Sequence, residues 1–218
     1  MWVREIKLAV VTGGHNFDVL NFNLLFRDLK DMDTYIQHMD DFTASSEAMR
    51  DSYDAILFYN YITEIPNDAT SPWWAGKRES ALKHLGTKSQ GIVVMHHAIL
   101  SYPGWFLWND LVGIKDRSFK YFFDQDVELE IASKHPSTEG LTNWHMKDET
   151  YLMADAKPAD GNTVLLKTTH KNSFNTLAWV RKYKNSKVIC LQSGHDSLAW
   201  RNPTFKKFLH QTILWSVG

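Results

Sequence analysis

The sequence predicts one α/β domain over residues 1–218, with a mainly parallel central sheet and an antiparallel elaboration near residues 119–185. Up to about residue 97, short apolar runs alternate with helix-like segments. This alternation is typical of βαβ units, which build parallel sheets with right-handed connections. The pattern then changes, and residues 127–131 alternate apolar and acidic side chains as a half-exposed strand does.

The first expected strand covers residues 6–11, an apolar run that ends at a Thr-Gly-Gly turn over residues 12–14. Asn16 follows as the expected N-cap of a helix that continues through Leu29. Such a helix packs one apolar stripe against the sheet. The expected stripe consists of Phe17, Leu20, Leu24 and Leu25.

The chain continues in the same alternation. A short helix should begin at Ser45 or Ser46 and end near Arg50. A longer helix should begin at Ser71-Pro72 and run to about His84, because proline is favoured at the first helical position. The strands around these helices are expected at residues 35–39, 53–59 and 91–95.

The last third of the chain predicts a strand pair at residues 163–166 and 177–180, followed by a strong apolar strand at residues 187–191. Asn202-Pro203 is the expected start of a closing helix. Its apolar face consists of Phe205, Phe208, Leu209, Ile213 and Leu214.

The charge balance disfavours several classes of partner. The chain has 24 basic and 25 acidic side chains and a net charge of -1, which offers no footprint for a nucleic-acid backbone. No basic cluster suggests a membrane surface, and no apolar run reaches the roughly 18 residues that span a bilayer. The start of the chain lacks the pattern of a signal peptide. Cys190 is the only cysteine, so a reducing, cytoplasmic compartment is expected.

Three of the expected parallel strands end close to histidine residues. The first strand leads to His15 and the last to His195, while the strand at residues 91–95 ends at His96-His97. In open parallel sheets, ligands bind outside the carboxyl ends of the strands. We therefore expect these loops, which are far apart in the sequence, to converge on a small-molecule site.

The catalytic candidates come from these loops. Neighbouring residues at a strand end point in opposite directions, so one of His96 and His97 can face the site, and the sequence does not say which. Asp196 can orient His195, act as a base or cap the next turn. Five histidines have the ordinary structural or exposed interpretation: His38, His84, His145, His170 and His210. The candidates are His96, His97, His195 and Asp196.

Other residues at this edge are candidates for binding a substrate. His15 and Asn16 lie in the turn after the first strand, and Tyr59 ends the third. The acids Asp148-Glu149 can enter the site from the inserted region or form a solvated pair. Trp105 follows the histidine pair and can stack on a sugar face or pack under its loop. The substrate-binding candidates are His15, Asn16, Tyr59, Trp105 and Glu149.

These residue types leave two kinds of chemistry open. Histidine exchanges protons near neutral pH, which suits general acid–base catalysis. Neutral imidazoles with a carboxylate also suit zinc or another divalent ion, although separate loops would have to hold it because no H-E-x-x-H spacing is present. No nucleophile elbow is present, and Cys190 lies inside an apolar strand. Residues 12–15 lack the spacing of a phosphate loop, so no nucleotide cofactor is expected.

Several short segments occur in the order found in one known family. They are residues 10–15, 91–99, 135–141, 148–151, 178–183 and 193–196, followed by Asn202-Pro203 and Ile213-Leu214-Trp215. Together they resemble the ThuA-like (trehalose utilisation) family over residues 6 to 218. One departure is the segment Lys184-Asn185-Ser186-Lys187, which replaces the usual Gly-Lys-Gly-Arg turn and puts the geometry of that turn in doubt.

The resemblance implies a class I glutamine amidotransferase-like fold, a flavodoxin-like three-layer sandwich. In true amidotransferases a nucleophilic cysteine occupies the turn after the strand that matches residues 93–95. Here that turn carries His96-His97, and no other cysteine can replace the nucleophile, so amidotransferase activity is not expected. The family is linked to sugar catabolism, especially of trehalose and 3-keto-sugars.

Three functions stay open at this stage. The leading one is an enzyme, a hydrolase or isomerase, acting on a sugar derivative through the histidine-rich site. The second is a sugar-binding or regulatory domain without catalysis, because one fold hosts many functions. The third is an assembly protein whose exposed aromatic residues, such as Trp73 and Trp74, form an interface, for example in a homo-oligomer.

Overall fold

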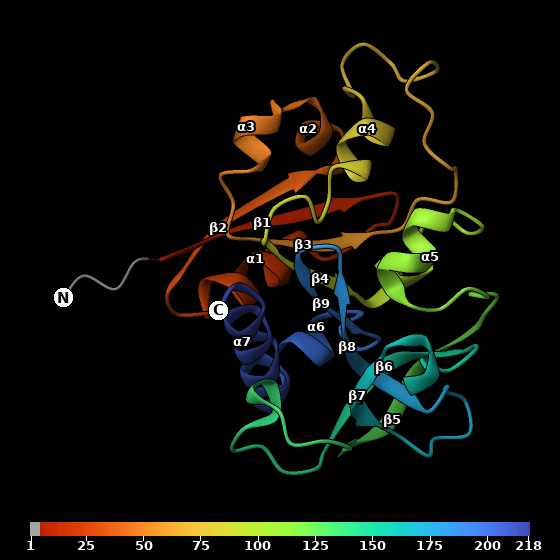
Figure 1. The fold of residues 1–218 in the computed structure, drawn as a ribbon. Coiled ribbons are helices and arrows are strands. Elements are labelled where there is room, and N and C mark those ends of the chain that lie inside the picture. Colours follow the sequence, from red (N-terminus) through yellow and green to blue (C-terminus); the bar gives the residue numbers. More distant parts are fainter. Residues whose placement is uncertain (1–4) are drawn as a thin grey trace.

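The structure, a computed structural model, describes residues 5–218 and has an α/β fold with a nine-stranded mixed sheet (Figure 1). Five neighbouring strands run parallel, in the order β2-β1-β3-β4-β9. Their bounds are β1 Ile6–Gly13, β2 Met32–His38, β3 Ala55–Asn60, β4 Gly91–Met95 and β9 Ser186–Leu191. The expected parallel sheet is therefore confirmed.

The other four strands form the antiparallel part of the sheet, which continues from β9 in the order β8-β7-β5-β6. They are β5 Lys120–Ile131, β6 Trp144–Leu152, β7 Thr163–Lys167 and β8 Thr176–Tyr183. This confirms the elaboration expected near residues 119–185. The expected strand at residues 127–131 is the second half of the longer β5, and β6 was not predicted.

Helices cover both faces of the parallel part (Figure 1). One face carries α1 (Val19–Arg27), α6 (Ser197–Trp200) and α7 (Pro203–Val217). The other carries α2 (Met39–Ala44), α4 (Arg78–Lys83) and α5 (Phe106–Val112), with α3 (Glu47–Arg50) beside α2. Three short 3₁₀ turns occur at His96–Leu100, Pro136–Thr138 and Pro158–Asp160.

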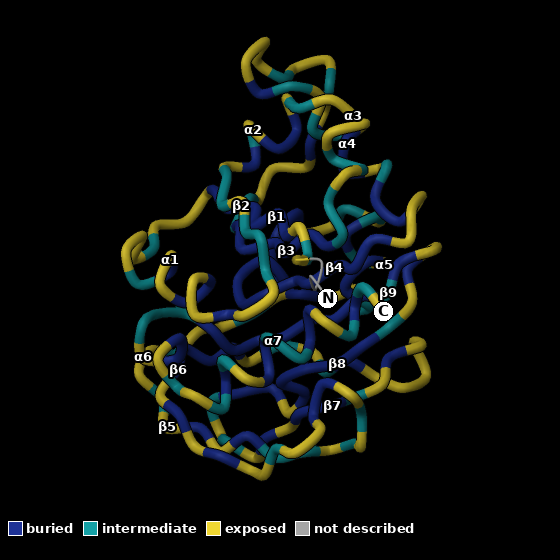
Figure 2. The backbone as a smooth tube through the Cα atoms, turned by 90° about the vertical axis from the view of Figure 1, so that its left-hand side faces the viewer, coloured by how far each residue is buried: buried dark blue, intermediate teal, exposed yellow. Residues whose placement is uncertain are grey.

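The two faces of β1 show why the core divides into two clusters. Successive side chains on a strand point to opposite faces. Leu8 and Val10 accordingly pack with α1 and α7, whereas Ala9 and Val11 pack with α2 and α4. Figure 2 shows the central strands as buried and the outer loops as exposed. None of the helices in the described residues is long and apolar enough to span a bilayer.

The first helix differs from the expectation at its N-terminus. Asp18, not Asn16, caps α1, since its carboxylate accepts the N–H of Asn21 at 3.0 Å. The expected apolar stripe is only partly correct. Leu25 is buried together with Phe22 and Phe26, and Phe17 packs against the core, whereas Leu20 and Leu24 are exposed.

The helix expected from Ser71-Pro72 begins later, at Arg78. Asp68 fixes this start because its carboxylate accepts the N–H groups of Glu79 at 2.8 Å and Ser80 at 3.1 Å. Pro72 instead lies in a turn, in which the carbonyl of Pro72 accepts the N–H of Ala75. Trp73 and Trp74 are exposed on the segment before α4, and their use as an interface stays a prediction.

The remaining differences are smaller. The second strand ends at His38, because Met39 begins the unpredicted helix α2. The closing helix starts at Pro203 with Asn202 as its cap, as expected, but Leu214 is partly exposed. The turn between β8 and β9 keeps a left-handed residue at Lys184 (φ 49°), although lysine stands there in place of glycine. Its ammonium group donates to the carbonyl groups of Lys83 and Leu85, which helps to hold the turn.

Ser101 connects the loops that follow β3 and β4. Its hydroxyl accepts the side-chain amide of Asn60 at 2.9 Å and the N–H of Ile62 at 3.1 Å, and it donates to the carbonyl of Asn60. We expect Ser101→Ala to lower the free energy of unfolding by about 1–3 kcal/mol, because it leaves buried amide donors without an acceptor. Urea denaturation measures this change. Ser89→Ala, at an exposed position, should change it by less than about 0.5 kcal/mol, and equal values for both variants would contradict the assignment.

Candidate functional site

The histidine loops meet at the carboxyl ends of β1, β4 and β9, as the sequence predicts. The Nε2 atom of His96 lies 3.0 Å from the Nδ1 atom of His195. The rings of His15 and His97 are 4.4 Å apart, and His15 is 6.0 Å from the ring of His195. Four imidazoles from three loops therefore lie in mutual contact or close to it.

His96 occupies a strained position directly after β4. Its φ angle is 56°, in the left-handed region that residues other than glycine seldom adopt. The side chain is fully buried, and its Nδ1 atom donates to the carbonyl of Gln192 at 2.6 Å. Because this bond places the proton on Nδ1, the Nε2 lone pair of the neutral ring faces the other site residues.

The β6 strand supplies two further side chains. Oxygen atoms of the Glu149 carboxylate lie 3.7 Å from His96 Nε2 and 3.5 Å from His195 Nδ1. The hydroxyl of Tyr151 lies 2.7 Å from His96 Nε2 and donates to it. Four strands (β9, β8, β7 and β5) separate β4 from β6 in the sheet order, so the antiparallel part returns to the carboxyl edge of β4.

Hydrogen bonds fix the loop that carries His195. The buried carboxylate of Asp148 accepts the N–H of Gly194 at 2.8 Å and that of His195 at 3.0 Å. The hydroxyl of Tyr59 donates to the carbonyl of His195 at 2.6 Å. Asp148 and Tyr59 therefore position this loop from β6 and β3.

Burial dominates the electrostatics of the cluster. It lowers the pKa of His96 well below the ordinary value, and the neighbouring His97 lowers it further. Burial also lowers the pKa of His195, and that of His97 to about 3. The pKa of Glu149 rises to about 7 for the same reason. Burial likewise raises the pKa of Asp148 to about 7, although the amide donors oppose the change. The rings of His96, His97 and His195 are therefore neutral at physiological pH.

A cavity of about 230 Å³ opens next to this cluster. One wall consists of aromatic rings from β5 and the segment before it, and Phe123 lies 5.8 Å from the ring of His195. The lining residues are His15, Tyr61, His97, Leu100, Phe119, Tyr121, Phe123, Glu149 and Tyr151. Glu149 belongs to both the cavity wall and the histidine cluster, so it connects the two.

The sequence-predicted residues have different places in this arrangement. His15, His97 and Glu149 line the cavity, whereas His96 and His195 belong to the cluster beside it. Of the pair at the end of β4, His97 lines the cavity, and the buried His96 contacts His195 and Tyr151 beside it. The catalytic and binding roles themselves stay predictions.

Besides His96 and His195, four candidates lie outside the cavity lining. Asp196 caps α6 by accepting the N–H of Leu198 at 2.8 Å. Asn16 is exposed, and its carbonyl accepts the Nδ1–H of His15 at 2.6 Å. Tyr59 is buried beneath the His195 loop.

Trp105, the fourth, lies at the start of α5 and packs on Tyr102, with ring centroids 5.4 Å apart. This contact matches the alternative that the ring packs under its own loop. The aromatic rings that line the cavity come instead from β5, the residue before it, β6 and the loop after β3.

Sequence reasoning missed the aromatic wall and Tyr151. Phe119, Tyr121 and Phe123 are spaced two residues apart, which places them on one face of an extended chain. The same spacing relates Tyr151 to Glu149. This periodicity was available in the sequence, but nothing in it indicated that the wall would face the histidines.

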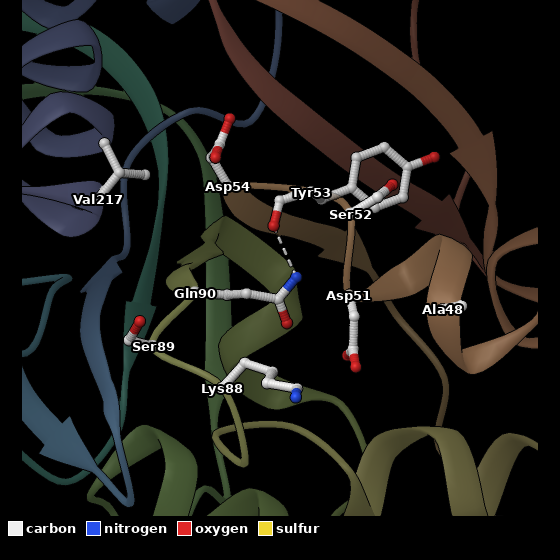
Figure 3. Close-up of a pocket in the computed structure, with 9 residues that line it drawn as sticks. All are labelled: Ala48, Asp51, Ser52, Tyr53, Asp54, Lys88, Ser89, Gln90 and Val217. Atoms are coloured by element: carbon white, nitrogen blue, oxygen red, sulfur yellow. Dashed lines mark hydrogen bonds between the residues drawn. The ribbon is translucent and has the colours of Figure 1, made fainter.

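Another cleft, of about 610 Å³, lies at the opposite edge of the sheet (Figure 3). Its residues include Asp54 and Gln90, which precede β3 and β4, and the Gln90 side chain donates to the carbonyl of Tyr53 at 2.8 Å. Ligands of parallel sheets bind at the carboxyl ends of the strands rather than at this edge. The cavity beside His97 is therefore the candidate site.

Comparison with known proteins gives a family and a set of similar folds. The family model described as trehalose utilisation, ThuA, matches residues 23–216. A structure of a ThuA-like protein from Parabacteroides merdae is similar, with a TM-score of 0.75 and 16% identity over 98% of this chain and 90% of that one. A ThuA-like protein from Bacteroides uniformis has a TM-score of 0.73 and 18% identity, with 97% and 91% covered.

A third similar structure is a cytoplasmic protein from Salmonella typhimurium, with a TM-score of 0.65 and 12% identity over 97% of this chain and 99% of that one. No curated protein matches the sequence. At these identities, the similar structures establish the fold alone.

Tyr59 offers a test of how the His195 loop is held. We expect Tyr59→Phe to lower the free energy of unfolding by about 1 kcal/mol, because it removes one hydrogen bond and keeps the ring. The NMR signals of the His195 ring should shift as the loop relaxes. Tyr53→Phe, which removes a hydroxyl that accepts from Gln37 at the opposite edge, should leave those signals unchanged. Unshifted signals in Tyr59→Phe would mean that other contacts hold the loop.

Proposed function

The chain belongs to the ThuA family of trehalose utilisation, and on that premise we propose that it is an enzyme acting on a carbohydrate or keto-sugar derivative. The reaction takes place where the cavity meets His96, His195 and Glu149. The observation that carries the proposal is that one cavity has an aromatic wall and, at Glu149, adjoins the rings of His96 and His195.

The two ends of the cavity suit the two faces of a sugar. Small-molecule sites combine apolar and aromatic surface with a few convergent polar groups. The rings of Tyr121 and Phe123, 5.2 Å apart, offer an apolar surface for the C–H face of a sugar ring. Glu149 and the imidazoles then face its hydroxyl or carbonyl oxygen atoms.

The polar end supports hydrolysis or isomerisation. Imidazole and carboxylate groups within hydrogen-bonding reach of a bound ligand can transfer protons or polarise an oxygen atom. His97 and His15 line the same cavity and can orient the ligand. The choice between the two reactions depends on the sugar derivative that binds.

Glutamine amidotransferase activity is not part of the proposal. The turn after β4 carries His96 where those enzymes have a nucleophilic cysteine. Cys190 is buried inside β9, and its burial raises the pKa of the thiol far above the ordinary value. A thiol in this state is a weak nucleophile.

The finer fold assignment is also proposed here. We assign the parallel part to the flavodoxin-like class, a three-layer sandwich, as in class I glutamine amidotransferases. The strand order β2-β1-β3-β4-β9 supports this assignment, because it matches the flavodoxin-like order. Helices on both faces of these strands also support it.

Glu149→Gln tests the catalytic part of the proposal. The variant should lower kcat/KM by about 100-fold or more on any sugar derivative that the wild type turns over, because it removes the carboxylate and keeps the shape. A panel of disaccharides and their 3-keto derivatives provides the assay. His145→Gln, at an exposed position of the same strand, is the matched control and should behave as wild type. Binding of a sugar without turnover would instead identify a sugar-binding domain.

Phe123→Ala tests the aromatic wall. Loss of a stacking surface worth about 1.4 kcal/mol should raise KM about tenfold and change kcat little, because the ring contacts the sugar and not the reacting atoms. Phe106→Ala removes another exposed phenyl ring, on α5 and outside the lining of this cavity, and should leave KM unchanged. Equal KM values for the two variants would remove Phe123 from the binding surface.

A further inference from the structure

We propose that His96, His195 and Glu149 bind one divalent transition-metal ion of the zinc type. The inference deepens the proposed function, since it places a cation at the polar end of the same cavity. Only the effect of the ion on a substrate depends on the proposed function. Metal binding itself can be measured with no sugar present.

The spacing of the three donor atoms fits such an ion. Four-coordinate zinc with bonds of about 2.0–2.1 Å places neighbouring ligand atoms about 3.3 Å apart. The nitrogen atoms of His96 and His195 are 3.0 Å apart. Glu149 faces the two rings with different oxygen atoms, since Oε1 lies 3.7 Å from His96 Nε2 and Oε2 lies 3.5 Å from His195 Nδ1. These distances and the distance between the rings lie on either side of the tetrahedral value, and one ligand atom from each residue lies within 4.8 Å of the others.

The surroundings of His96 are those of a metal ligand. Histidines that bind a metal through one nitrogen usually donate the other N–H to a carbonyl or carboxylate, which fixes the tautomer. His96 does this through Nδ1, which donates to the carbonyl of Gln192 at 2.6 Å. Its Nε2 lone pair is therefore fixed in direction toward Glu149 and His195.

The Nε2 lone pair of His96 has more polar neighbours than it can bind by hydrogen bonds. A neutral ring nitrogen accepts one good hydrogen bond. The hydroxyl of Tyr151 lies 2.7 Å from it and the Nδ1 atom of His195 lies 3.0 Å from it. The Glu149 carboxylate adds further lone pairs at the same point. A cation accepts electron density from His96, His195 and Glu149 at once, whereas no single proton can.

The ligand set leaves room for a reacting molecule. Two imidazoles and one glutamate are a known set for catalytic zinc, in which a further position stays open to water or substrate. Glu149 lines the cavity, so this open position faces it. An ion there polarises a sugar oxygen atom or lowers the pKa of a bound water. His15 and His97 stay available around the ligand.

Glu47, Asp51 and His84 form a second histidine–carboxylate cluster, on the surface. There the ring of His84 already bonds to Asp51 at 2.9 Å, and Glu47 is exposed. None of these three residues lines the cavity beside His97, and their cluster serves as the internal control.

The test uses the full chain, stripped of metal with a chelator and titrated separately with Zn²⁺ and Co²⁺ by calorimetry. Co²⁺ also reports its geometry through its visible absorption. We expect one tight site per chain and a tetrahedral Co²⁺ spectrum. Glu149→Gln and His195→Asn should each weaken binding by at least about 100-fold, since loss of a second-shell partner alone costs 10–100-fold. His84→Asn should retain the wild-type affinity.

Each result decides the question. Circular dichroism first confirms that each variant is folded. If His195→Asn is unfolded, the conservative variant Glu149→Gln still provides the test. The inference is wrong if the wild type binds neither ion, if binding is equally tight in both site variants, or if His84→Asn abolishes it. Metal binding without sugar turnover would support the inference and count against the proposed function. If the protein binds no metal and the metal-free protein still turns over a sugar, the result would support the proposed function and contradict the metal site.

Discussion

The geometry of the candidate site depends on the need of buried polar groups for hydrogen-bond partners. Gln192, at the end of β9, satisfies this need for three neighbouring elements. Its carbonyl accepts His96 Nδ1–H, its side-chain amide donates to the carbonyl of Glu149 at 2.6 Å, and its N–H donates to the carbonyl of Leu177 at 2.7 Å. An unpaired buried group costs about 1–3 kcal/mol. Moving β6 or the turn after β4 would break such a bond, and the site is therefore held in one arrangement.

Much of the site could be predicted because it follows from topology alone. Parallel strands bring their carboxyl ends to one edge, so recognising the strands was enough to place His15, His96 and His195 together. The contribution of β6 could not be predicted in this way. It depends on the bend of the antiparallel part and on a bulge in β5 at Asp124, which has a φ of 53°. Bulges of this kind re-aim side chains, and no local pattern in the sequence specifies how far.

The errors at the helix starts have the same physical origin. Caps were assigned from neighbouring residues, which worked for Asn202 because its side-chain oxygen Oδ1 accepts the N–H groups of Thr204 and Phe205. It failed for α4, where Asp68 supplies the acceptor from about ten residues upstream. It also failed for α1, where two polar residues competed and Asp18 was better placed than Asn16. A capping residue is defined by geometry that a distant loop can supply, so sequence spacing alone leaves the start of a helix open.

The turn after β4 shows how one fold can serve different chemistry. A left-handed residue at this turn costs about 1–3 kcal/mol unless the surrounding structure compensates for it. In class I glutamine amidotransferases, the fold that we propose for the parallel part, this turn presents a cysteine nucleophile. Here it presents His96, whose φ is 56° and whose Nδ1 bond to Gln192 offsets part of the strain. The strained turn therefore holds a fixed lone pair beside Glu149 and His195 rather than a reactive thiol. A lone pair of this kind can bind a cation or accept a proton, and the function follows from the residue at the turn and not from the fold.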